Sequence, residues 1–73
     1  MGNYSLLEQQ RRAETLEHMT RAMMIADKNI DHTEFEDGGD TVAIHYHTGY
    51  IRRVNVALDS PMEIIKDLAE HGF

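Results

Sequence analysis

The residues that could do chemistry in this chain are histidines and carboxylates, and they gather in its middle third. His45 and His47 lie two apart in an alternating stretch, so their imidazoles would share one face of a strand. Glu34 and Glu36 precede them in a segment that could pair alongside. Two imidazoles and a carboxylate can bind Zn²⁺ or Ni²⁺. Solvated residues on an open sheet face show the same pattern and His47 fits a turn, so we assign no metal ligand and no cofactor. A weak metal-binding regulator stays an alternative.

A calcium loop is the second chemistry that the sequence suggests. Asp27, Asn29 and Asp31 match the first, third and fifth ligand positions of an EF-hand loop. The sixth position needs glycine and holds His32, and the twelfth needs a bidentate glutamate and holds Gly38. The pattern therefore predicts a helix end followed by a polar loop, and no specific calcium site.

Catalytic groups are missing from the pattern. The chain has no cysteine, so thiol nucleophiles, disulfides and thiolate metal sites are excluded. Ser5 and Ser60 each fit a helix cap, and Gly38-Gly39 has no following helix or lysine to hold a phosphate. We assign no catalytic residue and predict that the protein is not an enzyme.

Composition describes a small folded domain. The 73 residues are 41% apolar and 27% charged, which is typical of one globular domain spanning 1–73. A net charge of −6 argues against direct nucleic-acid binding, which needs clustered cations. No apolar run approaches the ~20 residues that span a bilayer, and the first residues lack the features of a signal peptide. We expect a cytoplasmic protein without a membrane partner.

Residues 5–30 have the pattern of a helix. Ser5 and Glu8 form a capping box at its start. The polar face holds Gln9, Arg11, Arg12, Glu14, Arg21 and Lys28. Apolar residues recur at helical spacing on the other stripe: Leu6, Ala13, Leu16, Met19, Met23, Ala26 and Ile30. Such a helix is longer than a small sheet, so its first turns should either fray or dock on a second copy or another protein, and we expect docking.

Residues 31–58 change to period two and predict strands over 33–36, 41–47 and 50–58. A turn over 37–40 separates the first two. A three-residue loop with Gly49 in the left-handed region pairs Tyr46 with Tyr50. A two-residue loop would instead put Arg53 among the apolar residues, so we predict the longer loop. That register collects on one face Phe35, Val42, Ile44, Tyr46, Tyr50, Val54, Val56 and Leu58.

The last segment predicts a helix over 61–71. Ser60 is the N-cap, Pro61 occupies the first turn and Glu63 completes a capping box, with Gly72 as the residue after the end. The residues expected to face the sheet are Met62, Ile65, Leu68 and Ala69, with Ile64 on the flank. Arg52 is out of place on the apolar face, where it could extend over a sheet edge or pair with Glu63 or Asp67. The predicted fold is α+β, in the order α-β-β-β-α, a three-stranded antiparallel meander with both helices on one face.

Two surfaces are candidates for a partner, which we expect to be another protein. The first combines the start of the helix predicted over 5–30, which could support weak homodimerisation, with the open sheet face: Leu6, Leu7, His45, Ile51 and Arg53. The second is acidic and could act as a decoy for a nucleic-acid-binding protein: Asp27, Asp31, Glu34, Glu36, Asp37 and Asp40. The first suggests a non-enzymatic protein-interaction or accessory module, and the second an inhibitor.

The later part of the chain also resembles a known group of proteins. The segments 39–46, 48–56 and 59–68, within a resemblance covering about residues 30–72, look like small uncharacterised accessory proteins of conjugative mobile elements in Gram-positive gut bacteria. The resemblance implies a bacterial cytoplasm and an accessory or regulatory role. It includes no diagnostic motif and implies a role for no individual residue.

Overall fold

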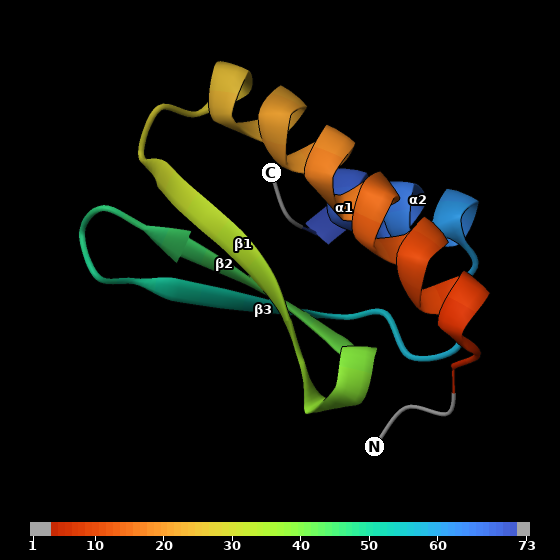
Figure 1. Ribbon diagram of the computed structural model, residues 1–73. Helices are drawn as coiled ribbons and strands as arrows, with labels where there is room; N and C mark the ends of the chain where they lie inside the picture. Colours follow the sequence, from red (N-terminus) through yellow and green to blue (C-terminus); the bar gives the residue numbers. More distant parts are fainter. Residues whose placement is uncertain (1–3, 72–73) are drawn as a thin grey trace.

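Two helices cover one face of a three-stranded antiparallel sheet in the computed structural model, which describes residues 4–71 (Figure 1). The strand order β1-β2-β3 follows the chain, so the sheet is a meander with β1 and β3 at its edges. The predicted α+β fold and its α-β-β-β-α order are confirmed. The elements are α1 (Leu6–Ala26), β1 (Ile30–Glu36), the 3₁₀ turn η1 (Asp37–Gly39), β2 (Thr41–Tyr46), β3 (Ile51–Asn55) and α2 (Pro61–His71).

The hairpin register agrees with the three-residue loop. Ile44 pairs with Arg52, Val42 pairs with Val54, and the Tyr46 amide donates to the Tyr50 carbonyl at 2.9 Å. The rings of Tyr46 and Tyr50 are neighbours, with centroids 5.5 Å apart. The predicted register is therefore confirmed, although both paired strands are shorter than expected.

Helix α1 ends at Ala26 rather than at residue 30. Asp27 is extended (φ −137°, ψ 106°) and its carboxylate accepts from the Asn29 amide at 2.9 Å. Asp and Asn favour such turns because their side chains compete for backbone groups. Ile30 therefore opens β1, opposite Tyr46 and with 2% of its surface exposed. The first strand thus begins three residues earlier than predicted.

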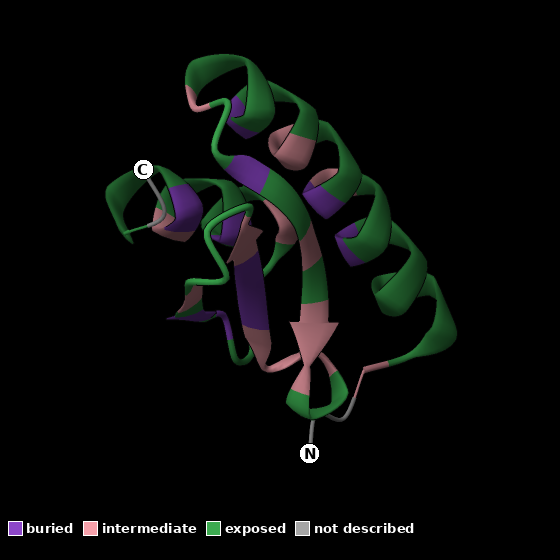
Figure 2. Ribbon diagram, turned by 90° about the vertical axis from the view of Figure 1, so that its left-hand side faces the viewer, coloured by how far each residue is buried: buried purple, intermediate pink, exposed green. Residues whose placement is uncertain are grey.

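The core lies between the helices and the sheet, and the inner side of α1 carries its buried residues (Figure 2). Its members are Leu16, Met23, Ile30, Val42, Ile44, Val54, Val56, Ile64 and Leu68, with Met19, Phe35 and Tyr46 packed against them. Several apolar residues that were expected inside are instead exposed: Leu6, Ala13, Ala26, Tyr50, Leu58, Met62, Ile65 and Ala69.

Two local causes explain the errors at Leu58 and in α2. β3 ends at Asn55, and the chain turns so that Leu58 takes a positive φ of 61° and leaves the sheet face. In α2, Ile64 and Leu68 point inward together because four residues make about one helical turn. The buried stripe is thus rotated by one residue, about 100°, from the one predicted through Met62 and Ile65.

Both predicted capping boxes are present. The Ser5 hydroxyl accepts from the Glu8 amide at 3.1 Å, and the Glu8 carboxylate accepts from the Ser5 amide at 3.1 Å. Ser60 and Glu63 make the same exchange at the start of α2, at 3.4 and 3.1 Å. The helix-ending role predicted for Gly72 lies outside the described residues.

Arg12, which the sequence places on the polar face, is a buried charged residue, 3% exposed. Its guanidinium donates to the carbonyls of Gly39 and Asp59, and to that of Val56 at 3.3 Å. The group lies over the Tyr4 ring, 4.1 Å from its centroid. One arginine therefore joins α1 to the turn before β2 and to the loop before α2.

Arg52 has a similar role at the other end of α2. Its guanidinium donates to the His71 carbonyl at 3.1 Å, rather than pairing with Glu63 or Asp67. The last carbonyls of a helix lack partners within it and attract cations. An arginine on the apolar face is thereby satisfied at the sheet edge.

Candidate functional site

The open face of the sheet, opposite the helices, carries polar side chains in cross-strand rows. His32 pairs with His45, and His45 pairs with Ile51. In the next row Glu34, Ala43 and Arg53 lie side by side. Because neighbouring residues along a strand alternate faces, these rows point away from the helix-covered core. The predicted residues His45, Ile51 and Arg53 are therefore together on this face.

Two stacked imidazoles and a carboxylate form a cluster on the open face, which we call the histidine cluster (His32, Glu34 and His45). The rings of His32 and His45 are nearly parallel, with centroids 4.2 Å apart and an interplanar angle of 10°. Glu34 Oε2 lies 2.6 Å from His45 Nε2 and 3.8 Å from His32 Nε2. One ligand atom from each residue lies within 4.8 Å of the others, a spacing that could hold a metal ion.

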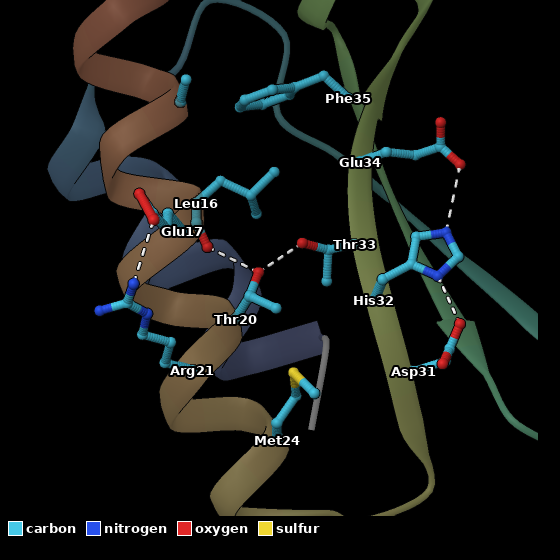
Figure 3. Close-up of a pocket in the computed structure, with 11 residues that line it drawn as sticks. Leu16, Glu17, Thr20, Arg21, Met24, Asp31, His32, Thr33, Glu34 and Phe35 are labelled. Atoms are coloured by element: carbon cyan, nitrogen blue, oxygen red, sulfur yellow. Dashed lines mark hydrogen bonds and ion pairs between the residues drawn. The ribbon is translucent and has the colours of Figure 1, made fainter.

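Asp31 supports the histidine cluster from its other side. Its Oδ2 lies 2.7 Å from His32 Nδ1, and its Oδ1 lies 3.4 Å from His47 Nδ1. The hydrogen bond with His32 is the main cause that lowers the pKa of Asp31 below its ordinary value. Figure 3 shows His32 between Asp31 and Glu34, directed away from α1. His47 thus reaches the cluster only through Asp31.

His32 is the member of the cluster that sequence reasoning missed. A strand beginning at residue 33 leaves His32 in the preceding loop, whereas a strand beginning at Ile30 puts it opposite His45. The β-branched Ile30 after Asn29 indicated an earlier strand start, but the sequence analysis had assigned Ile30 to the apolar face of the helix. Glu36, which was considered beside Glu34, instead bonds Arg53 at 2.8 Å, and this bond lowers the pKa of Glu36.

The residues of the predicted acidic surface lie just after the end of α1, in β1 and in the turn between β1 and β2. Each has a partner within the chain: the Asp27 carboxylate accepts a backbone amide, Asp37 accepts from Thr41, and Asp40 accepts from Tyr4. Glu36 forms an ion pair with Arg53 at 2.8 Å.

Leu6 and Leu7 belong to a different surface from the sheet residues with which they were grouped. They are 72% and 55% exposed at the start of α1, on the helical layer. Leu58 and Met62, 83% and 74% exposed, belong to the loop and first turn of α2 at the same end of the molecule. The Leu58 amide donates to the Tyr4 hydroxyl at 2.8 Å, which brings the two segments together. We call Leu6, Leu7, Leu58 and Met62 the apolar end.

Contacts of Tyr4 hold the apolar end in place. The Tyr4 hydroxyl also donates to the Asp40 carboxylate at 2.8 Å, and its ring stacks under the Arg12 guanidinium. Gln9 donates to the Tyr4 carbonyl at 3.0 Å, which adds to the capping box at Ser5. Leu6 and Leu7 thus belong to a first turn of α1 that is fixed by several hydrogen bonds.

A groove of about 410 Å³ separates α1 from the edge strand β1 (Figure 3). Leu16 and Met24 from α1 and Phe35 from β1 line it. The hydroxyls of Thr20 and Thr33 bond to each other across it. Charged residues also line the groove: Glu17, Arg21, Asp31, His32 and Glu34.

Comparisons with known proteins give no relative from which to transfer a function. No family of proteins matches the chain, and neither a curated protein nor a solved structure matches it. Among the described residues, no helix has the length and apolar character needed to cross a membrane. Function must therefore be argued from the apolar end and the open sheet face.

Proposed function

We propose that the chain is a non-enzymatic protein-interaction module, and that the apolar end is its principal contact surface. The observation that carries the proposal is the exposure of Leu6, Leu7, Leu58 and Met62 on anchored segments. Large apolar side chains held in one place on a small domain typically mark an interface, because their burial is favourable. An accessory role in a bacterial cytoplasm, as the resemblance implies, is part of the same proposal.

The simplest occupant of the apolar end is a second copy of the chain. Each copy has a charge of −6, so two copies repel one another at low ionic strength. Salt screens this repulsion and leaves apolar contact intact. Self-association through the apolar end should therefore strengthen as salt is added, whereas binding of a basic partner by the acidic edge should weaken.

Sedimentation velocity over a wide concentration range tests the proposal. We expect a reversible dimer for the intact chain, lost when Leu6 and Leu7 are both changed to Ser. The matched control is Ile25→Ser, which removes an even more exposed apolar residue, 82% exposed, from the far end of the same helix. A chain that stays monomeric at all concentrations and salt levels would refute self-association, and equal loss in both variants would refute the surface assignment.

A further inference from the structure

We propose that His32, Glu34 and His45 form a binding site for a divalent transition-metal ion of the Zn²⁺ class, with Asp31 as the group that orients His32. The site is on the open face of the sheet, so it goes beyond the interaction proposed for the apolar end. Two imidazoles and one carboxylate form a ligand set of the kind seen in open zinc sites, where water completes the coordination.

The contact of Asp31 with His32 selects the nitrogen that faces the metal. A carboxylate 2.7 Å from Nδ1 accepts its proton, which leaves Nε2 of the neutral ring as the free electron pair. This Nε2 is the atom directed toward Glu34. Ligating histidines commonly donate their second nitrogen to a carboxylate in this way, and the arrangement makes the ring a stronger ligand.

His45 contributes a ligand atom without a hydrogen-bond partner. Its Nε2 is buried and, although Glu34 Oε2 lies 2.6 Å away, the two atoms do not have hydrogen-bond geometry. A buried polar atom without a partner costs free energy. A metal ion coordinated by both atoms would satisfy this nitrogen and separate it from the carboxylate oxygen.

The separations suit a tetrahedral ion after small side-chain rotations. Ligands at 2.0–2.1 Å from Zn²⁺ lie about 3.3 Å from one another, and the distances of 2.6 and 3.8 Å from Glu34 lie on either side of that value. The parallel rings must turn for their electron pairs to converge. The side chain of His32 is 52% exposed, which leaves room for its ring to turn about the contact with Asp31, and metal binding should therefore open the stack.

A second group with similar spacing is less suitable. Asp67, Glu70 and His71 approach one another at the end of α2, but they include one imidazole. Hard oxygen-rich sets favour Mg²⁺ or Ca²⁺ over Zn²⁺. This group provides the matched control for the experiment.

The test is calorimetric titration of the untagged, metal-free protein with Zn²⁺ at neutral pH, together with NMR of the histidine ring protons. We expect one Zn²⁺ per chain, shifts at His32 and His45, and no binding of Mg²⁺. His45→Ala should lower the affinity at least about tenfold, since loss of even an outer-shell partner lowers metal affinity by about 10–100-fold. His71→Ala should leave the affinity unchanged.

Glu34→Gln is the second test variant, because it keeps the shape of the side chain and lies on the solvent face. It should also lower the affinity, with a melting temperature of the metal-free protein close to that of the intact chain. Equal affinity of the intact chain, His45→Ala and Glu34→Gln would overturn the proposal. Loss of binding in His71→Ala alone would place the metal on α2 and would overturn it as well.

Discussion

Replacing Arg12 by Ala should be among the most damaging single changes in this chain. The guanidinium supplies donors to the carbonyls of Gly39, Val56 and Asp59. A hydrogen bond with a charged donor contributes about 1.5–3 kcal/mol, and a buried acceptor left alone costs about 1–3 kcal/mol. Water can reach two of the three carbonyls in part, so about 1 kcal/mol for each is the appropriate value.

The aromatic contacts of Arg12 add to this figure. The guanidinium lies 4.1 Å from the Tyr4 ring centroid and 5.3 Å from that of Phe35, and such contacts contribute about 0.5–2 kcal/mol. We therefore expect Arg12→Ala to lower the free energy of unfolding by about 3–5 kcal/mol. A 73-residue domain has a total of roughly 4–11 kcal/mol, so the variant should be close to unfolding.

Urea unfolding followed by circular dichroism measures this effect. Arg11→Ala is the control, because Arg11 is the exposed neighbour in the same helix and its loss should change stability by less than about 0.5 kcal/mol. Arg12→Lys should fall between the two, since an ammonium cannot reach three carbonyls in a fixed fork. A loss below about 1 kcal/mol in Arg12→Ala would refute the role assigned to the arginine.

Three further changes test other parts of the fold. Ser60→Ala should lower stability by about 1 kcal/mol through loss of the α2 cap, and an unchanged melting curve would show that packing alone holds the helix. Gly39→Ala should lower stability by more than about 1 kcal/mol, because φ is +102° and the new Cβ would lie 3.2 Å from the Tyr4 ring; wild-type stability would contradict this geometry. Burial, then the neighbouring Asp67 carboxyl, raise the pKa of Asp59 to about 6, so the folded state binds the proton more tightly and this group's contribution to stability falls as pH rises from about 4 to 6. Asp59→Asn should remove this decrease in stability with rising pH. After allowance for solvent screening, the variant should be about 1 kcal/mol more stable than wild type at pH 7. Urea unfolding at pH 4, 5 and 7 measures the effect, and identical pH profiles of the two proteins would contradict it.

Local signals were sufficient for the secondary structure and the hairpin register. Ser60 and Pro61 mark a helix start by their own chemistry, and Gly49 allows one loop that keeps Val42 and Val54 on the same face. These features depend on neighbours in the chain, which the sequence displays directly.

The interior position of Arg12 could not be predicted in this way. Its acceptors are carbonyls 27 to 47 residues away, and a carbonyl is present in every residue, so no side-chain pattern indicates the match. The prediction of the histidine cluster was incomplete for a simpler reason. A helix end placed four residues too late removed His32 from the strand and hid its pairing with His45.

The long reach of Arg12 also bears on the order in which the chain folds. Its acceptors lie on both sides of the β2-β3 hairpin, so the arginine can be seated only after the sheet is complete and the chain has passed Asp59. Closing such loops costs chain entropy before any contact offsets it. During synthesis the guanidinium therefore stays without these acceptors until residue 59 has been made, and we expect its contacts to form late in folding. Interactions formed after the rate-limiting step mainly slow unfolding, so this one side chain would set how long the folded molecule persists more than how fast it forms.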